Sequence, residues 1–245
     1  SPSRTASGTP LGNPLQEPSR DRLLPDRGEE VSSAQAPGKG RELRDPDIRE
    51  ALRLQLAKLH GENRGTLIID ELSLGRREAR VDVAVINGRL EGFEIKSARD
   101  SLARLPGQRD VYNRVFDRLT VICTAKHLHG VAALVPDWWG LSTAMVANGE
   151  VLLSQVRPTS PNPQPDPEAI VQLLWRDEVL ALLEVSGGTR GLRSKPRPVL
   201  WAALVARTDP ASLSRMVRET MRARGDWRSD HRAAPGGGAT RPSAK

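Results

Sequence analysis

The chain has few of the residues on which several classes of protein depend. It contains one cysteine, Cys123, among 245 residues, so no intramolecular disulfide framework can form and a reducing compartment is indicated. No run of about 18 apolar residues occurs, which is the length that a membrane-spanning helix requires. The N-terminal segment lacks the apolar core of a secretory signal peptide. These absences argue against a membrane partner and favour a cytoplasmic protein.

The composition is basic and only moderately apolar. Lys and Arg number 37 against 30 Asp and Glu, for a formal net charge of +7, and 38% of the residues are hydrophobic. A basic balance favours a polyanionic partner such as nucleic acid. Pro, Gly, Ser and charged residues dominate 1–44 and 229–245, without sustained hydrophobic periodicity. We therefore expect disordered tails around one medium-sized domain with extensions.

Hydrophobic periodicity between the tails predicts an α/β protein. The Asp45-Pro46 helix-start signal precedes apolar residues at helical spacing, which predicts a first helix. A helix between two strands makes a crossover, so strands 91–97 and 119–124 are expected to be parallel neighbours. The predicted order is helix 46–60, strand 66–72, hairpin 79–96, helix 100–117, strand 119–124, short helix 128–134 and a hairpin of strands 142–146 and 151–156. The expected fold class is a mixed central sheet flanked by helices.

A basic helical module is expected after this core of residues 45–156. Prolines recur through 157–167, which excludes regular structure and predicts a flexible linker. Helices are predicted at 168–185, 199–207 and 212–224. The later half of this module, residues 168–228, is rich in cations: Arg190, Arg193, Lys195, Arg197, Arg215, Arg218, Arg222, Arg224 and Arg228.

One segment carries a pattern that points to chemistry. The odd positions of hairpin 79–96 include a set of apolar residues: Val81, Val83, Val85, Phe93 and Ile95. The even positions include two acids and an amine: Asp82, Glu94 and Lys96. Because side chains alternate between faces along a strand, one face is expected to be apolar and the other to gather the charges. Two carboxylates beside a lysine suit a divalent cation together with a water or phosphate oxygen.

The loop of this hairpin decides whether the two acids share a face. Asn87-Gly88 is a strong two-residue turn signal, and a strict two-residue loop would pair Asp82 with Phe93 and separate the acids. A three-residue loop ending in Gly88 in the left-handed conformation, or a bulge, keeps them together. Only that register places the apolar rows of both strands on one face. We therefore predict the odd loop.

With the next helix included, the pattern resembles a nuclease superfamily. Asp82, Glu94-Ile95-Lys96 and Gln108-Arg-Asp-Val-Tyr112 resemble the PD-(D/E)XK superfamily and the Gln-x-x-x-Tyr motif of its RecB-like branch. The predicted element order is similar to the restriction-endonuclease-like core of that superfamily. The wider chain, including residues 136–140, is similar to a bacterial family assigned to the same fold. Val81 stands where the superfamily name has proline, which is a common variation.

The resemblance implies a Mg²⁺- or Mn²⁺-dependent deoxyribonuclease. Asp82, Glu94 and the Ile95 carbonyl are expected to hold the metal ion, which polarises the scissile phosphate and lowers the pKa of a bound water. Lys96 is expected to position that water and to stabilise charge that develops on the phosphate oxygens. The basic module is expected to contact the DNA backbone.

Further roles follow from the same resemblance. Gln108 is expected to hold Lys96 or a phosphate oxygen, and Tyr112, one turn further on the same helix face, to support it. Many members of the superfamily carry an additional acid. Glu50 on the first helix and Glu71 at the end of the first strand are both candidates for that acid.

Two rival functions stay open. The first is a nucleic-acid-binding protein on the same fold that does not cleave. The second is a regulatory or assembly protein whose helical module binds another protein. A solvated strand face with a cross-strand ion pair would also produce the acids and lysine of the hairpin, without any chemistry. Cleavage of both strands of a duplex would favour a homodimer.

Overall fold

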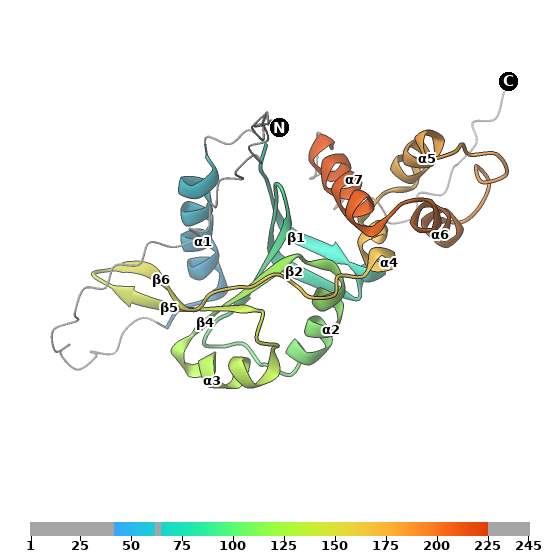
Figure 1. Ribbon diagram of the computed structural model, residues 1–245. Helices are drawn as coiled ribbons and strands as arrows, with labels where there is room; N and C mark the ends of the chain where they lie inside the picture. The colour runs from blue at the N-terminus through green and yellow to red at the C-terminus, as the bar shows by residue number, and fades with distance from the viewer. Residues whose placement is uncertain (1–41, 62–64, 225–245) are drawn as a thin grey trace, which may run out of the picture. The chain divides into compact units, whose positions relative to one another are not determined.

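The computed structural model describes residues 42–61 and 65–224 (Figure 1). The helices and strands, in chain order, are α1 (Asp45–His60), β1 (Leu67–Leu74), η1 (Gly75–Arg77), β2 (Ala79–Ile86), β3 (Leu90–Lys96), α2 (Leu105–Val115), β4 (Arg118–Thr124), α3 (Ala125–Leu134), β5 (Gly140–Ala147), β6 (Glu150–Arg157), α4 (Pro167–Ile170), η2 (Val171–Leu173), α5 (Arg176–Val185), α6 (Arg197–Arg207) and α7 (Pro210–Ala223). Within the described ranges, no helix has the length and apolar character needed to cross a membrane.

The predicted disordered tails, 1–44 and 229–245, lie outside the described residues except for residues 42–44. In that short stretch the Leu43 side chain is buried in the cluster that α1 forms with the sheet. Residue 43, which was predicted to belong to a disordered tail, is therefore packed in the core.

The six strands form one mixed sheet in the order β1-β2-β3-β4-β5-β6. The β1–β2, β2–β3 and β5–β6 pairs are antiparallel, whereas β3–β4 and β4–β5 are parallel. The helices α2 and α3 supply the crossovers between the parallel strands. The parallel pairing expected for strands 91–97 and 119–124 is confirmed, and so is the mixed α/β fold class.

Helices cover both faces of the sheet, with α1 on one side and α2 and α3 on the other (Figure 1). On the first face Ile48, Leu52 and Leu56 of α1 pack against Val83, Val85 and Phe93. Burial of each such aliphatic side chain stabilises the fold by about 1.5–3 kcal/mol relative to exposure. On the second face α2, α3 and the C-terminal helices contribute to one larger cluster.

The prediction of one apolar and one charged hairpin face is correct only in part: Val83, Val85, Phe93 and Ile95 share one cluster, but the other face is not simply charged. The even positions Ala84 and Ile86 are buried on the α2 side, so helices cover both faces of β2. Val81 packs in that cluster as well, and not with Val83 and Val85 as predicted. The alternation changes phase at Asp82, one residue before the Val83–Phe93 pair at which the ladder between β2 and β3 ends.

The C-terminal helices pack onto the core through a segment without regular structure. Residues 158–166 contain no helix or strand, as their prolines predicted. The flexible connection expected there is instead held by hydrogen bonds, because Asn162 Nδ2 donates to the carbonyls of Asn113 (2.7 Å) and Phe116 (2.8 Å). The predicted helix 168–185 is divided into α4, η2 and α5. Val171, Leu204 and Val217 share the large cluster with α2 and the sheet.

Candidate functional site

Asp82 lies where the antiparallel strands β2 and β3 cease to pair. Its Oδ2 accepts a hydrogen bond from the backbone N–H of Ile95 at 2.7 Å. The side chain thus satisfies a strand N–H that the backbone of β2 leaves without a ladder partner. This bond fixes the Asp82 carboxylate between β2 and the end of β3, next to Glu94 and Lys96.

A three-residue loop sets this register, as predicted, but the loop does not end in Gly88. The last pair of the hairpin is Ile86–Leu90, so the loop consists of Asn87, Gly88 and Arg89. The predicted left-handed conformation of Gly88 is wrong, because Gly88 is not among the residues with positive φ. The Asn87 side chain closes the loop instead, with its Oδ1 accepting from the Arg89 N–H at 3.0 Å. An asparagine turn of this kind needs no left-handed residue.

Glu94 is the centre of a hydrogen-bonded network that joins β3 to α2. Its Oε1 accepts from Lys96 Nζ and from Gln108 Nε2, both at 2.7 Å. Its Oε2 accepts from the Tyr112 hydroxyl at 2.8 Å. Lys96 Nζ also donates to Gln108 Oε1 at 3.0 Å, which closes the network. The structure therefore joins in one network four of the five side chains that the hairpin and helix motifs singled out.

The start of α2 places Gln108 and Tyr112 toward Glu94. Helix 100–117 was predicted, but the helix begins only at Leu105, with Pro106 in its first turn. Proline is tolerated there because the first N–H groups of a helix have no intrahelical acceptor. Gln108 and Tyr112 then lie one turn apart on the same face of the helix.

Aromatic packing fixes Tyr112. Its ring lies edge-on to Phe116, with 5.7 Å between centroids, and stacks on Trp139 at 6.1 Å. Trp139 is fully buried and donates from Nε1 to Asn113 Oδ1 at 2.9 Å. Burial, and the neighbouring Glu94 carboxylate, raise the pKa of the Tyr112 hydroxyl, so this group remains a donor.

The two acids carry an electrostatic cost in this arrangement. Burial raises the pKa of Glu94, and the nearby Asp82 carboxylate raises it further, while Lys96 opposes both effects. Burial also raises the pKa of Asp82, against the hydrogen bonds from Ile95 and Arg49. Two close carboxylates with raised pKa values favour the binding of a cation.

Arg49 is a residue of the site that the sequence patterns did not reveal. Its Nη2 donates to Asp82 Oδ1 and its Nη1 to the Asp82 backbone carbonyl, both at 2.7 Å. The only sequence signal was the spacing of Asp45 and Arg49, which favours an ion pair within one helix. The reach from α1 to β2 depends on how that helix packs on the sheet.

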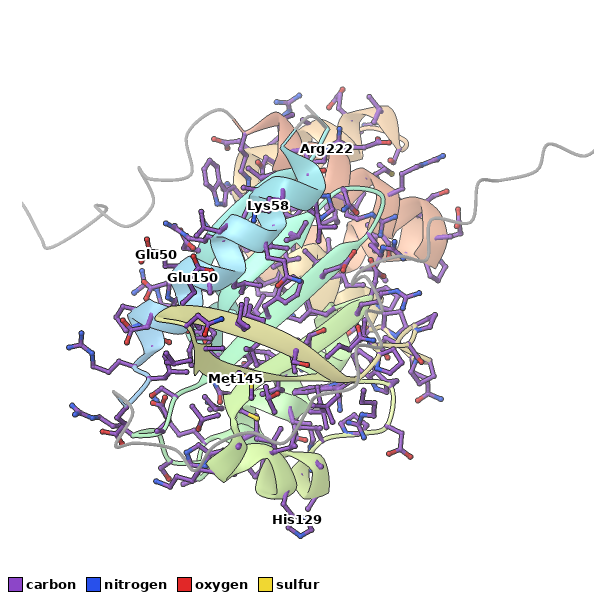
Figure 2. The ribbon with its side chains drawn as sticks, turned by 90° about the vertical axis from the view of Figure 1, so that its left-hand side faces the viewer. Glu50, Lys58, His129, Met145, Glu150 and Arg222 are labelled. Atoms are coloured by element: carbon purple, nitrogen blue, oxygen red, sulfur yellow. The ribbon has the colours of Figure 1, made fainter. Side chains whose placement is uncertain are left out.

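Neither candidate for an additional acid joins the network. Glu50 is exposed on α1 and points away from the sheet (Figure 2). Glu71 adopts a left-handed φ of 55° and lies 3.3 Å from Arg80. Asp45, which was expected only to mark the start of the first helix, is close enough to raise the pKa of Asp82. Across residues 42–61 and 65–224, no cluster of three or more acids, histidines or cysteines suited to a metal occurs.

The donor set nevertheless suits a hard divalent cation. Asp82 and Glu94 supply carboxylate oxygens, the ligand type that Mg²⁺ and Mn²⁺ prefer, and each oxygen can accept more than one partner. The two acids differ in access, since the Asp82 side chain is 22% exposed and that of Glu94 is 3% exposed. Asp82 is therefore the candidate ligand that solvent reaches directly, and Glu94 and the Ile95 carbonyl are the inner candidates.

The C-terminal module contains two groups of cationic side chains that differ in their surroundings. Arg224 pairs with Glu178 at 2.6 Å and lies over the Trp175 ring, and Arg218 lies 3.3 Å from Asp117. These two arginines hold the fold together. A second group is exposed: Arg190, Arg193, Lys195, Arg197, Arg207, Arg215 and Arg222, the last labelled in Figure 2. The predicted contribution of Arg228 lies outside the described residues.

Fold and site together define a mixed α/β protein with a buried acid–lysine pair on a central strand. The chain belongs to the family described as Bacteriophage P4 protein cII, which it matches over residues 39–231. Protein cII of Enterobacteria phage P4 is 37% identical over 109 residues, which cover 44% of this chain and 41% of that protein. The aligned region thus spans less than half the length of this relative. No solved structure gives a significant match.

Proposed function

We propose that the protein is a metal-dependent nuclease of the PD-(D/E)XK type that hydrolyses phosphodiester bonds in DNA. The observation that carries the proposal is the network in which Glu94 accepts from Lys96, Gln108 and Tyr112. These residues come from two separate motifs, and Asp82 lies beside them at the divergence of two strands. An ion pair formed by chance on a strand face would not recruit the glutamine and tyrosine of the next helix.

The residues divide the work of such a reaction. Asp82, Glu94 and the Ile95 carbonyl would hold Mg²⁺ or Mn²⁺, which supplies Lewis-acid polarisation of the phosphate and a more acidic water. Lys96 orients a water and stabilises charge on the phosphate oxygens. Gln108 keeps the Lys96 ammonium in place, and Tyr112 anchors the second oxygen of Glu94.

The exposed cations of α6, α7 and the segment before them support a nucleic-acid substrate. Lys and Arg side chains bind phosphates without reading sequence, and they release counter-ions when they do so. The proposal therefore assigns backbone affinity to this surface and chemistry to the Glu94 network. A homodimer would suit cleavage of both strands, as C2 symmetry matches that of duplex DNA.

A non-cleaving DNA-binding protein is the second candidate, and one observation favours it. The side chains of Glu94 and Lys96 are 3% and 5% exposed, and both oxygens of Glu94 already accept from protein donors. Productive catalysis therefore needs a rearrangement that exposes Lys96 to the phosphate. A protein that only binds DNA needs no such change.

Cleavage of linear, nicked and single-stranded DNA with Mg²⁺ or Mn²⁺ tests the proposal, with EDTA as the metal-free control. Asp82→Ala and Lys96→Ala should abolish cutting. Asp70→Ala is the matched control, because Asp70 is an acid on the neighbouring strand β1 that pairs with Arg53 outside the site. Cutting that survives in Asp82→Ala and Lys96→Ala would refute the assignment of the site.

Salt-titrated DNA binding separates the remaining candidates. A steep loss of affinity with salt is expected if exposed arginines contact phosphates. Binding without cleavage by the wild-type protein would favour the non-cleaving candidate. Absence of binding at low salt would remove both DNA functions and leave a protein-binding role for the helical module.

A further inference from the structure

Arg49 has two acidic partners on different elements. Besides Asp82, its guanidinium contacts Asp45, one turn earlier on α1, through Nε at 3.1 Å and Nη2 at 3.2 Å. Asp45 and Asp82 therefore share one cation. The three side chains are 37%, 22% and 19% exposed for Asp45, Asp82 and Arg49, so the chain of charges is open to solvent on one side.

The position of the guanidinium matters because it contacts one of the acids assigned to the metal. A divalent cation at Asp82 and an arginine 2.7 Å from the same carboxylate would repel each other strongly in a partly buried site. Lys96 lies equally close to Glu94, the other acid assigned to the metal, but the proposed reaction uses the Lys96 ammonium. Arg49 has no role in that reaction, so at Asp82 it acts only as a competitor of the cation.

Asp45 offers a place for the guanidinium when it leaves Asp82. The Asp45–Arg49 pair has the i,i+4 spacing at which oppositely charged side chains meet on a helix. A rotation of the arginine side chain could keep the Asp45 contacts and give up those to Asp82, with no change in α1. Helix α1 thus carries both Arg49, which competes with the cation for Asp82, and Asp45, the acid with which Arg49 can pair instead.

We propose that Arg49 is an internal counter-ion of Asp82 that competes with a divalent cation and is retained by Asp45 when the cation binds. This inference rests on the proposed metal site, and it assigns to Arg49 and Asp45 the control of metal affinity at that site. The apparent affinity for metal is then the net result of two cations competing for one carboxylate.

Titration of Mn²⁺ without nucleic acid, with free Mn²⁺ followed by electron paramagnetic resonance, tests the competition. Arg49→Met should tighten Mn²⁺ binding by at least about tenfold, because a positive charge is removed from the ligand. Asp45→Asn should weaken binding several-fold, since Arg49 then has only Asp82. Arg53→Met is the matched control, because Arg53 lies one turn further on α1 and pairs with Asp70. The Mn²⁺ affinity of the Arg53→Met variant should equal that of the wild-type protein.

The double variant Arg49→Met/Asp45→Asn sharpens the test. The effect of Asp45→Asn should be largely lost in the Arg49→Met background, because the shared cation is gone. Arg49→Gln serves as a second variant if Arg49→Met does not fold, with circular dichroism as the check on structure.

The outcomes distinguish the inference from the function on which it rests. Unchanged or weaker Mn²⁺ binding by Arg49→Met, with clear binding by the wild type, would overturn the competition and show that Arg49 only positions Asp82. Absence of saturable binding in the wild type and in every variant would overturn the proposed metal site itself, and the inference with it.

Discussion

The two carboxylates of the site are neutralised in different ways. Glu94 is almost completely sealed, and its cation, Lys96, lies two residues away on the same strand. Asp82 is partly open, and its cation comes from another element, Arg49 of α1. A sealed charge has only protein groups to solvate it, whereas an open one can exchange partners with water or ions. The buried Glu94–Lys96 pair, the sealed half of the site, therefore keeps its partners. At the Asp82–Arg49 pair, the open half, ligands can exchange.

The largest effect is expected from removing Lys96, the cation that pairs with Glu94. Lys96→Met leaves Glu94 as an unpaired buried charge, which should cost about 3–5 kcal/mol of unfolding free energy. Arg49→Met should cost only about 1–3 kcal/mol, because water can solvate part of the Asp82 carboxylate. Urea unfolding of both variants measures the difference. Equal losses would contradict the contrast between a sealed and an open half.

Removal of one neutral donor from the sealed half should have an intermediate effect. The Tyr112 hydroxyl lies 2.8 Å from both Glu94 Oε2 and the Arg80 carbonyl. Tyr112→Phe keeps the ring packing against Phe116 and Trp139 but leaves Glu94 with one donor fewer, at a cost of about 1–3 kcal/mol. Unfolding by urea, compared with Arg53→Met as a surface ion-pair control of about 0–1 kcal/mol, provides the measure. A loss no larger than that control would show that the hydroxyl contributes nothing specific.

The pH dependence of stability should report the raised pKa of Glu94. The folded protein then holds the proton of the Glu94 carboxyl more tightly than the unfolded chain does. The stabilisation that comes from this proton is therefore fully present below the ordinary pKa of glutamate, about 4.3. It is lost as the pH rises toward the higher pKa that Glu94 has in the folded protein. The slope from this group cannot exceed about 1.4 kcal/mol per pH unit. Glu94→Gln should flatten the profile measured by urea unfolding above about pH 4, and an unaltered slope would contradict the assignment.

The smallest effect is expected at the loop that sets the register of the two halves. Asn87→Ala removes the side-chain acceptor for the Arg89 N–H and should cost about 0.5–1.5 kcal/mol. Gly88→Ala should change stability by less than about 0.5 kcal/mol, because a Cβ there meets no atom within 4 Å and the backbone is not left-handed. Thermal unfolding of the two variants decides between the asparagine turn and a left-handed glycine. A larger loss from Gly88→Ala would favour the glycine.

The sequence patterns were most informative where contacts are local or periodic. The odd loop followed from matching the apolar rows of β2 and β3, and the meeting of Gln108 and Tyr112 followed from helical spacing. The parallel pairing of β3 and β4 followed from the crossover helix between them. Each of these features depends on backbone periodicity or on a connection of limited length, which a short stretch of sequence encodes.

Other features depended on neighbours distant in the chain. Val81 was expected to share a face with Val83, but the ladder ends at Val83 and the strand changes phase at Asp82. Glu50 and Glu71 were candidates for an additional acid on the basis of their elements alone. The structure turns Glu50 to solvent and pairs Glu71 with Arg80. The orientation of a side chain beyond its own element depends on packing that no local pattern contains.

The sequence by itself determined the element order, the mixed α/β class and the close approach of Asp82, Glu94 and Lys96, because strand and helix periodicity act over a few residues. Only the tertiary structure decided that Glu94 is sealed by α2, that Asp82 stays partly open, and that Arg49 of α1 pairs with it. Those properties follow from how helices separated by tens of residues pack on the two faces of one sheet. Burial and charge pairing, and through them the electrostatics of the site, are consequences of that packing.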